Sequence, residues 1–276
     1  MPLLHAIILG IVQGLTEFLP VSSSAHLIIL PWLLHWDDGG LTFDVALHVG
    51  TLAAVVLFFF RDWVQIIGQG LGLNPGVDPG LSKNRGLLWL LIAGTIPGGI
   101  AGVLFEKQAE SAFRSPYIIA AAAIGVGLIM WIADVAGRKR KDIAHVSLAD
   151  SLTVGFAQAF AIIPGVSRSG STIAAALFRG MDRPTAARFS FLLSTPIIAG
   201  AAAKKYWDVM KHNGGIPHDM QTAFLAGIIA SAITGCIAIA FFLNFLRRRS
   251  LALFVWYRIL FGIIVVALAL FRASGR

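Results

Sequence analysis

One polar motif occurs twice in a chain that is otherwise strongly apolar, and this repetition constrains the fold more than any other feature. The first copy spans residues 13–26 and the second spans residues 158–172. Gln13 and Gln158 are 145 residues apart (158 − 13). The same spacing pairs Gly10 with Gly155, Val21 with Val166, Ser22 with Ser167 and Ser24 with Ser169. Ionisable side chains at apolar depth are costly and usually functional, so the two copies are expected to build one site.

The composition identifies the chain as a polytopic membrane protein. Of its 276 residues, 57% are hydrophobic and only 13% are charged, and the mean hydropathy is +0.79. A soluble globular domain carries about 25% charged residues. The net charge of +8 is assigned to loops, where Lys and Arg set topology and meet anionic lipid. No nucleic-acid partner is expected.

Six apolar segments are long enough to cross a bilayer, because a spanning helix needs about 20 mostly apolar residues. They are residues 42–60, 87–105, 116–136, 187–204, 222–246 and 251–272. Two further regions, 3–35 and 151–180, each hold two shorter apolar pieces separated by a proline and serines. Each region therefore predicts a re-entrant helix pair. Irregular backbone at membrane depth is tolerated only beside protein or a watery cavity, so a cavity is expected there.

The basic loops orient these segments in the membrane. The densest positive clusters are residues 138–141 and 247–249, and cytoplasmic loops are enriched in Lys and Arg. Counting spans from these clusters puts loops 106–115 and 205–221 outside. The first short-helix pair then enters the membrane from outside, and the second enters from inside.

Opposite entry of the two copies predicts an inverted internal repeat within a single integral membrane domain, residues 1–276. The two halves are approximately 1–136 and 151–272. Inverted repeats with broken helices are typical of secondary transporters, whose sites lie near the bilayer midplane. The predicted fold is an all-α polytopic membrane protein with six spanning helices and two re-entrant helix pairs.

Gln13 and Glu17 are the polar pair of the first copy. They are four residues apart, so on a helix they share one face. Oxygen atoms from both side chains could hold a divalent cation. The alternative is a single buried carboxylate that is bonded to neighbouring hydroxyls. Membrane depth favours function for Glu17, whereas both interpretations stay open for Gln13.

The serines that follow lie at a predicted helix start. Pro20 ends the preceding helix because it cannot continue the backbone hydrogen bonding, and Ser22, Ser23 and Ser24 come next. Hydroxyls at a helix start cap free N–H groups, and the same position binds anions. At least one serine is expected only to cap. His26 shares the face of the first two serines and can act as base, acid or nucleophile.

The second copy replaces the acid and the imidazole with a guanidinium. Arg168 is accompanied by Ser167, Ser169, Gly170 and Thr172. The fork of an arginine matches two oxygens of a tetrahedral anion, and glycine lets the backbone approach a ligand closely. The pattern predicts a phosphate cradle. The alternative is a snorkelling arginine among capping serines.

Three residues outside the two copies are weaker candidates. Asp44 and His48 are four residues apart and share a face of the next helix. They either support the site from behind or form a pair at the membrane interface. Arg258 lies within the last predicted span and is a candidate for an additional phosphate contact.

Together these motifs resemble the undecaprenyl-diphosphate phosphatase family, the bacitracin-resistance type of integral membrane phosphatase. The resemblance covers nearly the whole chain and rests on residues 14–23 with His26, and on residues 164–170, with 189–193 in support. It implies hydrolysis of undecaprenyl diphosphate to undecaprenyl phosphate, which recycles the lipid carrier of peptidoglycan synthesis and gives bacitracin resistance. It also implies a bacterial cytoplasmic (inner) membrane location, a divalent cation (Mg or Ca), and a polyprenyl diphosphate substrate among membrane lipids. A homodimer is left open.

The resemblance also implies roles for single residues. Members often carry a second glutamate four residues before the essential one, whereas this chain has Gln13, a neutral and weaker metal ligand. The expected catalytic residues are Glu17, Ser23, His26 and Arg168. The expected phosphate-binding residues are Ser22, Ser24, Ser167, Ser169, Gly170, Thr172 and Arg258, and the expected metal ligands are Glu17 and Gln13. Whether His26 or Ser23 is the nucleophile stays open.

Two other classes of protein compete with a phosphatase. A secondary transporter or lipid flippase with a phosphate-binding midplane site shares the inverted repeats and broken helices. It has no need of a nucleophile or a base, however, and the motifs contain candidates for both. A membrane scaffold is a third reading, and it leaves the buried charges unexplained.

Overall fold

The computed structural model describes residues 1–36, 40–73, 75–138, 140–212 and 218–274, and in these ranges its regular structure is helical apart from one isolated bridge between Lys141 and Met181. The α-helices are α1 (Leu3–Phe18), α2 (Ser23–Leu34), α3 (Gly40–Phe58), α4 (Phe60–Gly70), α5 (Pro79–Ser82), α6 (Leu87–Leu104), α7 (Glu106–Glu110), α8 (Pro116–Ala136), α9 (Leu148–Ala159), α10 (Arg168–Phe178), α11 (Arg183–His212), α12 (His218–Leu246) and α13 (Ala252–Ser274). Short 3-10 turns are η1 (Ala112–Arg114), η2 (Ile143–His145) and η3 (Phe160–Ile162). The all-α class is confirmed.

Five helices of the described chain are long and apolar enough to cross a membrane, namely α6, α8, α11, α12 and α13. A sixth span exists only if α3 and α4 are taken together, and that pair is bent by 75°. The predicted span 42–60 therefore does not run straight, because its helix breaks at Phe59, where the backbone leaves helical geometry. The protein is a multi-pass membrane protein.

Two elements differ in extent from their prediction. Helix α11 has 30 residues and is longer than the predicted span 187–204. Its helical backbone continues into polar residues, and a prediction from apolar segments ends before them. Helix α4 lies directly after the predicted span 42–60. It is amphipathic, with Gln65, Ile66 and Gln69 buried, so it packs as a helix without being a span.

The two motif regions are broken helices, with the breaks where the prolines predict them. Pro20 lies in the gap between α1 and α2, and Pro164 lies between η3 and α10. The start of α9 is also encoded locally, since Ser147 and Asp150 form a capping box. Such a box satisfies two free N–H groups reciprocally.

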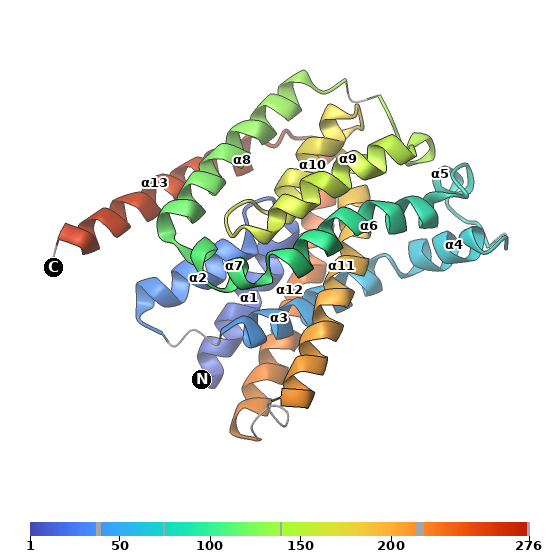
Figure 1. Ribbon diagram of the computed structural model, residues 1–276. Helices are drawn as coiled ribbons and strands as arrows, with labels where there is room; N and C mark the ends of the chain where they lie inside the picture. Colours follow the sequence, from blue (N-terminus) through green and yellow to red (C-terminus); the bar gives the residue numbers. More distant parts are fainter. Residues whose placement is uncertain (37–39, 74, 139, 213–217, 275–276) are drawn as a thin grey trace.

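Helices from distant parts of the chain pack against one another in pairs (Figure 1). Helix α1 packs against α12, α9 packs against α6, and α8 lies along α13. Glycines allow the helices of the first two pairs to approach each other closely. A Cβ atom on Gly10 would lie 2.4 Å from the carbonyl oxygen of Gly227, and one on Gly155 would lie 2.1 Å from that of Gly94. A larger residue at either glycine would push the helices apart.

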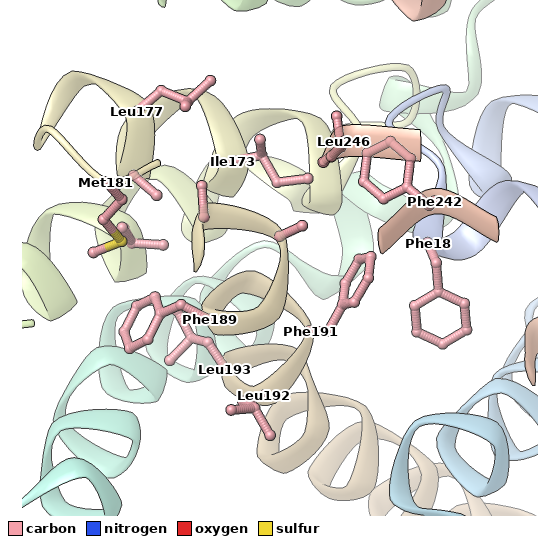
Figure 2. Close-up of a cluster of buried hydrophobic side chains, with 14 of the residues drawn as sticks. Phe18, Ile173, Leu177, Met181, Phe189, Phe191, Leu192, Leu193, Phe242 and Leu246 are labelled. Atoms are coloured by element: carbon pink, nitrogen blue, oxygen red, sulfur yellow. The ribbon is translucent and has the colours of Figure 1, made fainter. Parts of the chain in front are cut away.

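A phenylalanine cluster supports the first motif from behind (Figure 2). The ring of Phe18 meets Phe191 edge-on at a centroid distance of 5.2 Å, and Phe191 lies 6.0 Å from Phe242. All three are at most 1% exposed. The cluster joins α1, α11 and α12 and holds the end of α1, where Glu17 lies, in a fixed position.

Candidate active site

The two motif turns have the same unusual backbone conformation. Ser22 and Ser167 have φ values of 76° and 67°, and each directly precedes a helix, α2 or α10. Positive φ is uncommon for a residue with a side chain, and such strain clusters at functional sites. The equivalence that was inferred from spacing therefore extends to the backbone of the turns.

The two turns touch one another, as the sequence predicts. The backbone N–H of Gly165 donates to the hydroxyl of Ser22 over 3.1 Å. In the other direction, the hydroxyl of Ser169 donates to the carbonyl of Leu19, also over 3.1 Å. Each copy thus satisfies a polar group of the other, and the two helix starts meet at one place.

Arg258 joins the turns and does not line the cavity described below. It is 0% exposed, and its guanidinium donates to five backbone carbonyls. The acceptors are the oxygens of Pro20 (3.2 Å), Ala122 (3.3 Å), Ala123 (3.0 Å), Gly165 (2.7 Å) and Val166 (3.1 Å). These bonds make Arg258 a support of both turns, and its contact with phosphate stays a prediction.

Glu17 is the centre of the site. Its Oε1 accepts a hydrogen bond from the guanidinium of Arg168, and its Oε2 accepts one from the hydroxyl of Ser23. The amide of Gln13 also donates to Oε2 over 3.0 Å. Glu17 is 6% exposed, so the ion pair balances a buried charge. Three of the four residues expected to be catalytic are thus in contact.

A cavity of about 580 Å³ opens beside this cluster. The polar residues that line it next to the two motifs are Glu17, Ser22, Ser23, Ser24, His48, Gln158, Ser167 and Arg168, and Thr95 and Lys205 also line it. Small and apolar residues of α6 and α11, including Gly98, Gly102 and Ile197, line most of the rest. The half-exposed pair of Glu106 and Lys204 lies at its rim. The cavity therefore combines the ionic cluster of the two motifs with an apolar wall, and further charged residues lie at its rim.

The remaining residues of the second motif support the lining from behind. The N–H of Gly170 donates to the hydroxyl of Ser167 over 3.1 Å, which caps α10. Thr172 is fully buried and its hydroxyl lies 2.5 Å from that of Ser190 on α11. Ser169, Gly170 and Thr172 do not line the cavity. Of the predicted cradle, Ser167 and Arg168 reach it.

His26 lies beside the Ser22 turn and does not line the cavity. Its Nδ1 lies 2.7 Å from the carbonyl oxygen of Ser22, and its Nε2 lies 2.7 Å from the hydroxyl of Tyr257. The ring stacks on Phe261 at a centroid distance of 4.6 Å. This geometry makes His26 a support of the Ser22 turn, while its catalytic role stays a prediction.

His48 is the histidine that the structure places on the cavity. Its Nε2 lies 3.6 Å from Oε2 of Glu17. Its Nδ1 lies 2.6 Å from the backbone oxygen of Asp44, so Nδ1 donates and Nε2 faces the carboxylate. The sequence predicted for His48 only a supporting role behind the site or a place in a pair at the membrane interface. Its spacing of four residues from Asp44 drew attention to His48. Its contact with Glu17 depends on tertiary packing, and no local sequence pattern predicts it.

The donor atoms around Glu17 fit a cation that is shared with a ligand. The described residues contain no group of three or more His, Cys, Asp or Glu side chains able to hold a metal, so this part of the chain has no all-protein cage. The Oε1 of Gln13 is buried without a hydrogen-bond partner among these residues. Mg²⁺ is often held by one or two carboxylates together with substrate phosphates, and Glu17 with Gln13 is compatible with that arrangement.

This fold and this site define a class: a multi-pass helical membrane protein with a buried, serine-rich ionic site beside an apolar cavity. The chain belongs to the bacitracin resistance protein BacA family, whose family model matches residues 6–264. The family that the motifs indicated is thereby confirmed.

Curated relatives match over almost their whole length. The chain is 53% identical over 267 residues to an undecaprenyl-diphosphatase of Moorella thermoacetica, covering 97% of this chain and 98% of the relative. It is 48% identical to one of Pelotomaculum thermopropionicum over 275 residues and the full length of both chains. A third, from Geobacter sulfurreducens, is 49% identical over 269 residues, which are 97% of this chain and 98% of the relative.

Proposed function

We propose that this chain hydrolyses undecaprenyl diphosphate to undecaprenyl phosphate and inorganic phosphate. The observation that carries the proposal is the contact of Glu17, Ser23 and Arg168, drawn from both motif copies, beside the apolar wall of the cavity. The relatives described above are named undecaprenyl-diphosphatase. The transporter or flippase alternative has no support among them. Lipid-carrier recycling in peptidoglycan synthesis and bacitracin resistance follow from this activity.

The cavity suits a substrate with a doubly charged head and an apolar tail. Arg168 and the helix start at Ser167 would bind the terminal phosphate, because a guanidinium and free N–H groups both favour anions. The tail would lie along the small and apolar residues of α6 and α11, where Gly98 and Gly102 leave room. On this arrangement the scissile bond lies near Ser23.

Hydrolysis forms a bond from an oxygen nucleophile to the terminal phosphorus and breaks the bond from that phosphorus to the bridging oxygen. The lipid monophosphate leaves with the bridging oxygen. Ser23 and Glu17 are the pair placed for this step, since the serine hydroxyl donates to a carboxylate that can take its proton. Attack by Ser23 would leave the phosphoryl group on the serine oxygen. A water molecule would then attack that phosphorus and release inorganic phosphate, and a proton of the water would restore the serine hydroxyl. Arg168 would stabilise the charge that develops on the phosphoryl oxygens. His26 would hold the Ser22 turn that precedes the nucleophile.

Glu17 and Gln13 would hold the expected divalent cation, Mg or Ca. When bound, such a cation neutralises charge on a diphosphate. All other roles described above belong to residues of the chain itself.

An inverted repeat with halves of about 1–136 and 151–272 in one domain is part of the proposal. It is supported by the matching backbone of Ser22 and Ser167 and by the close glycine contacts of α1 with α12 and of α9 with α6. With the basic loops on the cytoplasmic side, the cavity rim at Glu106 and Lys204 would face the outside of a bacterial inner membrane. The homodimer stays a prediction, which light scattering of the detergent-solubilised protein tests.

The test is release of inorganic phosphate from farnesyl or undecaprenyl diphosphate by the purified protein in detergent. Wild-type protein should release phosphate, and Glu17→Ala and Arg168→Ala should each lose nearly all of that activity. Lys83→Ala, on the cytoplasmic loop far along the chain from both motifs, serves as a control that should keep full activity. Turnover at wild-type rates in both site variants would sink the proposal.

A further inference from the structure

Gln158, in the last turn of α9, is a buried amide that no protein group satisfies. It is 3% exposed and lines the cavity. Neither its Oε1 nor its Nε2 has a hydrogen-bond partner within the described parts of the chain. Burying an unpaired amide is costly, and buried polar groups in native proteins are almost always bonded. The amide is therefore suited to a partner that enters the cavity.

The equivalent residue in the first copy shows what Gln158 lacks. Gln13 donates its amide N–H to Glu17, four residues further along α1. The residue four positions after Gln158 is Ile162, which also lines the cavity but offers no acceptor. The donor that the first copy uses internally is thus available in the second copy.

The position of Gln158 along the cavity indicates which part of a substrate it meets. A Cβ atom on Gly98 of α6 would lie 3.3 Å from Nε2 of Gln158 and 2.6 Å from the side chain of Ile197 on α11. The amide is therefore packed where the apolar wall begins, whereas Arg168 lies in the ionic cluster beside Glu17. A diphosphate whose terminal phosphate lies at Arg168 and whose tail follows α6 and α11 has its other phosphate between them.

We propose that Gln158 forms a subsite for the phosphate that stays attached to the lipid, with its amide N–H donated to a non-bridging oxygen of that phosphate. This inference rests on the proposed function and deepens it, because it assigns the second phosphate of the substrate to its own residue. The same contact would hold the lipid monophosphate product. Inorganic phosphate, which derives from the terminal phosphate at Arg168, would not contact Gln158.

Gln158→Met separates this role from a structural one. Methionine keeps the length of the side chain and removes both polar atoms. The dissociation constants of farnesyl phosphate and of inorganic phosphate are measured directly on purified protein in detergent. We expect the affinity for farnesyl phosphate to fall about tenfold, the loss of one hydrogen bond to a charged oxygen, with inorganic phosphate unchanged. The melting temperature without ligand should not fall, because the variant removes an unsatisfied amide.

Gln69→Met is the matched control, because Gln69 is also buried with an unpartnered Nε2 but lies on α4 outside the cavity lining. It should leave both affinities unchanged. Unchanged farnesyl phosphate affinity in Gln158→Met, or an equal loss for both ligands, overturns the inference. So does a fall in kcat alone, which would assign Gln158 to the attacking water. Gln158→Ala is the second variant should the first not fold. Since binding requires no turnover, a wild-type protein that releases no phosphate would overturn only the proposed function.

Discussion

Ser23 and Arg168 occupy equivalent positions in the two motif copies, 145 residues apart (168 − 23), yet they bring different chemistry to one carboxylate. Each is the first residue of its helix, after a serine with positive φ. The hydroxyl of Ser23 binds Oε2 of Glu17, and the guanidinium of Arg168 binds Oε1. The two copies therefore share a backbone and divide the roles between them.

The division explains why the second copy has no acid. The position equivalent to Glu17 is Ile162 (162 − 17 = 145), and the position equivalent to His26 is Ser171 (171 − 26 = 145). A second buried carboxylate would need a second cation, since an unpaired buried charge is strongly destabilising. Two turns with matching backbone and different side chains thus meet at one carboxylate, and each of the following predictions tests one side of that contrast.

The largest effect is expected when the shared ion pair is broken. Glu17→Ala and Arg168→Ala should each lower kcat/KM about 1,000-fold and lower stability by about 3–5 kcal/mol, because each leaves an unpaired buried charge. The double variant should recover thermal stability and stay inactive. Phosphate release and melting temperature in detergent measure both effects. A double variant no more stable than the singles would show that the pair does not exist.

His26→Ala should lower kcat about 100-fold, since a small displacement of the Ser22 turn misplaces Ser23. Tyr257→Phe removes only the hydroxyl that contacts Nε2 of His26 and should have a smaller effect. His48→Ala, on the cavity side, gives the direct comparison. Full activity in His26→Ala would contradict both a catalytic role of His26 and its support of the Ser22 turn.

The glycine crossings test whether the two halves are structurally equivalent. Gly10→Ala and Gly155→Ala should each destabilise the protein by about 1–3 kcal/mol, because the new methyl group would meet a backbone oxygen of the crossing helix. Gly99→Ala is the control, since a Cβ there meets nothing within 4 Å. Melting temperatures measure the cost. A large loss at only one crossing would contradict the equivalence.

The smallest effect concerns Asp150, for which the first copy has no counterpart, because the equivalent residue is His5 (150 − 145). Burial alone would raise the pKa of Asp150, but hydrogen bonds from Lys141, the Ser147 backbone and Arg179 outweigh it and lower the pKa from 3.8 to about 2. Asp150 lies in the first turn of α9, outside the spanning helices.

A lowered pKa means that Asp150 contributes stability above its unfolded value of 3.8, and that this stability is lost as pH falls towards about 2. The contribution should be about 1–2 kcal/mol. Asp150→Asn should therefore melt lower than wild type at pH 6, and the two melting temperatures should converge as the pH falls from 4 to 2.5. A constant difference across that range would contradict the assignment.

Local signals in the sequence were enough for the helix breaks and for the members of the ionic cluster. Pro20 and Pro164 mark the breaks, and Glu17 with Arg168 are conspicuous because charge at apolar depth is rare. The same reasoning gave no sign that Arg258 binds backbone carbonyls, since a buried arginine can satisfy either a ligand or carbonyls and spacing does not distinguish them. It also undervalued His48, whose contact with Glu17 spans 31 residues (48 − 17) and depends on how α1 packs against α3. The bend at Phe59 has no proline or glycine beside it, and hydropathy gave no sign of it.

Arg258 has a consequence for biogenesis. The carbonyls at Pro20, Gly165 and Val166 lie where helices are interrupted, and in lipid such groups need donors from elsewhere in the protein. Their donor comes from α13, which is synthesised after both turns. Both turns must therefore wait, incompletely bonded, until α13 is inserted. A nascent chain arrested before Arg258 would hold every residue of the ionic cluster and still lack the finished site.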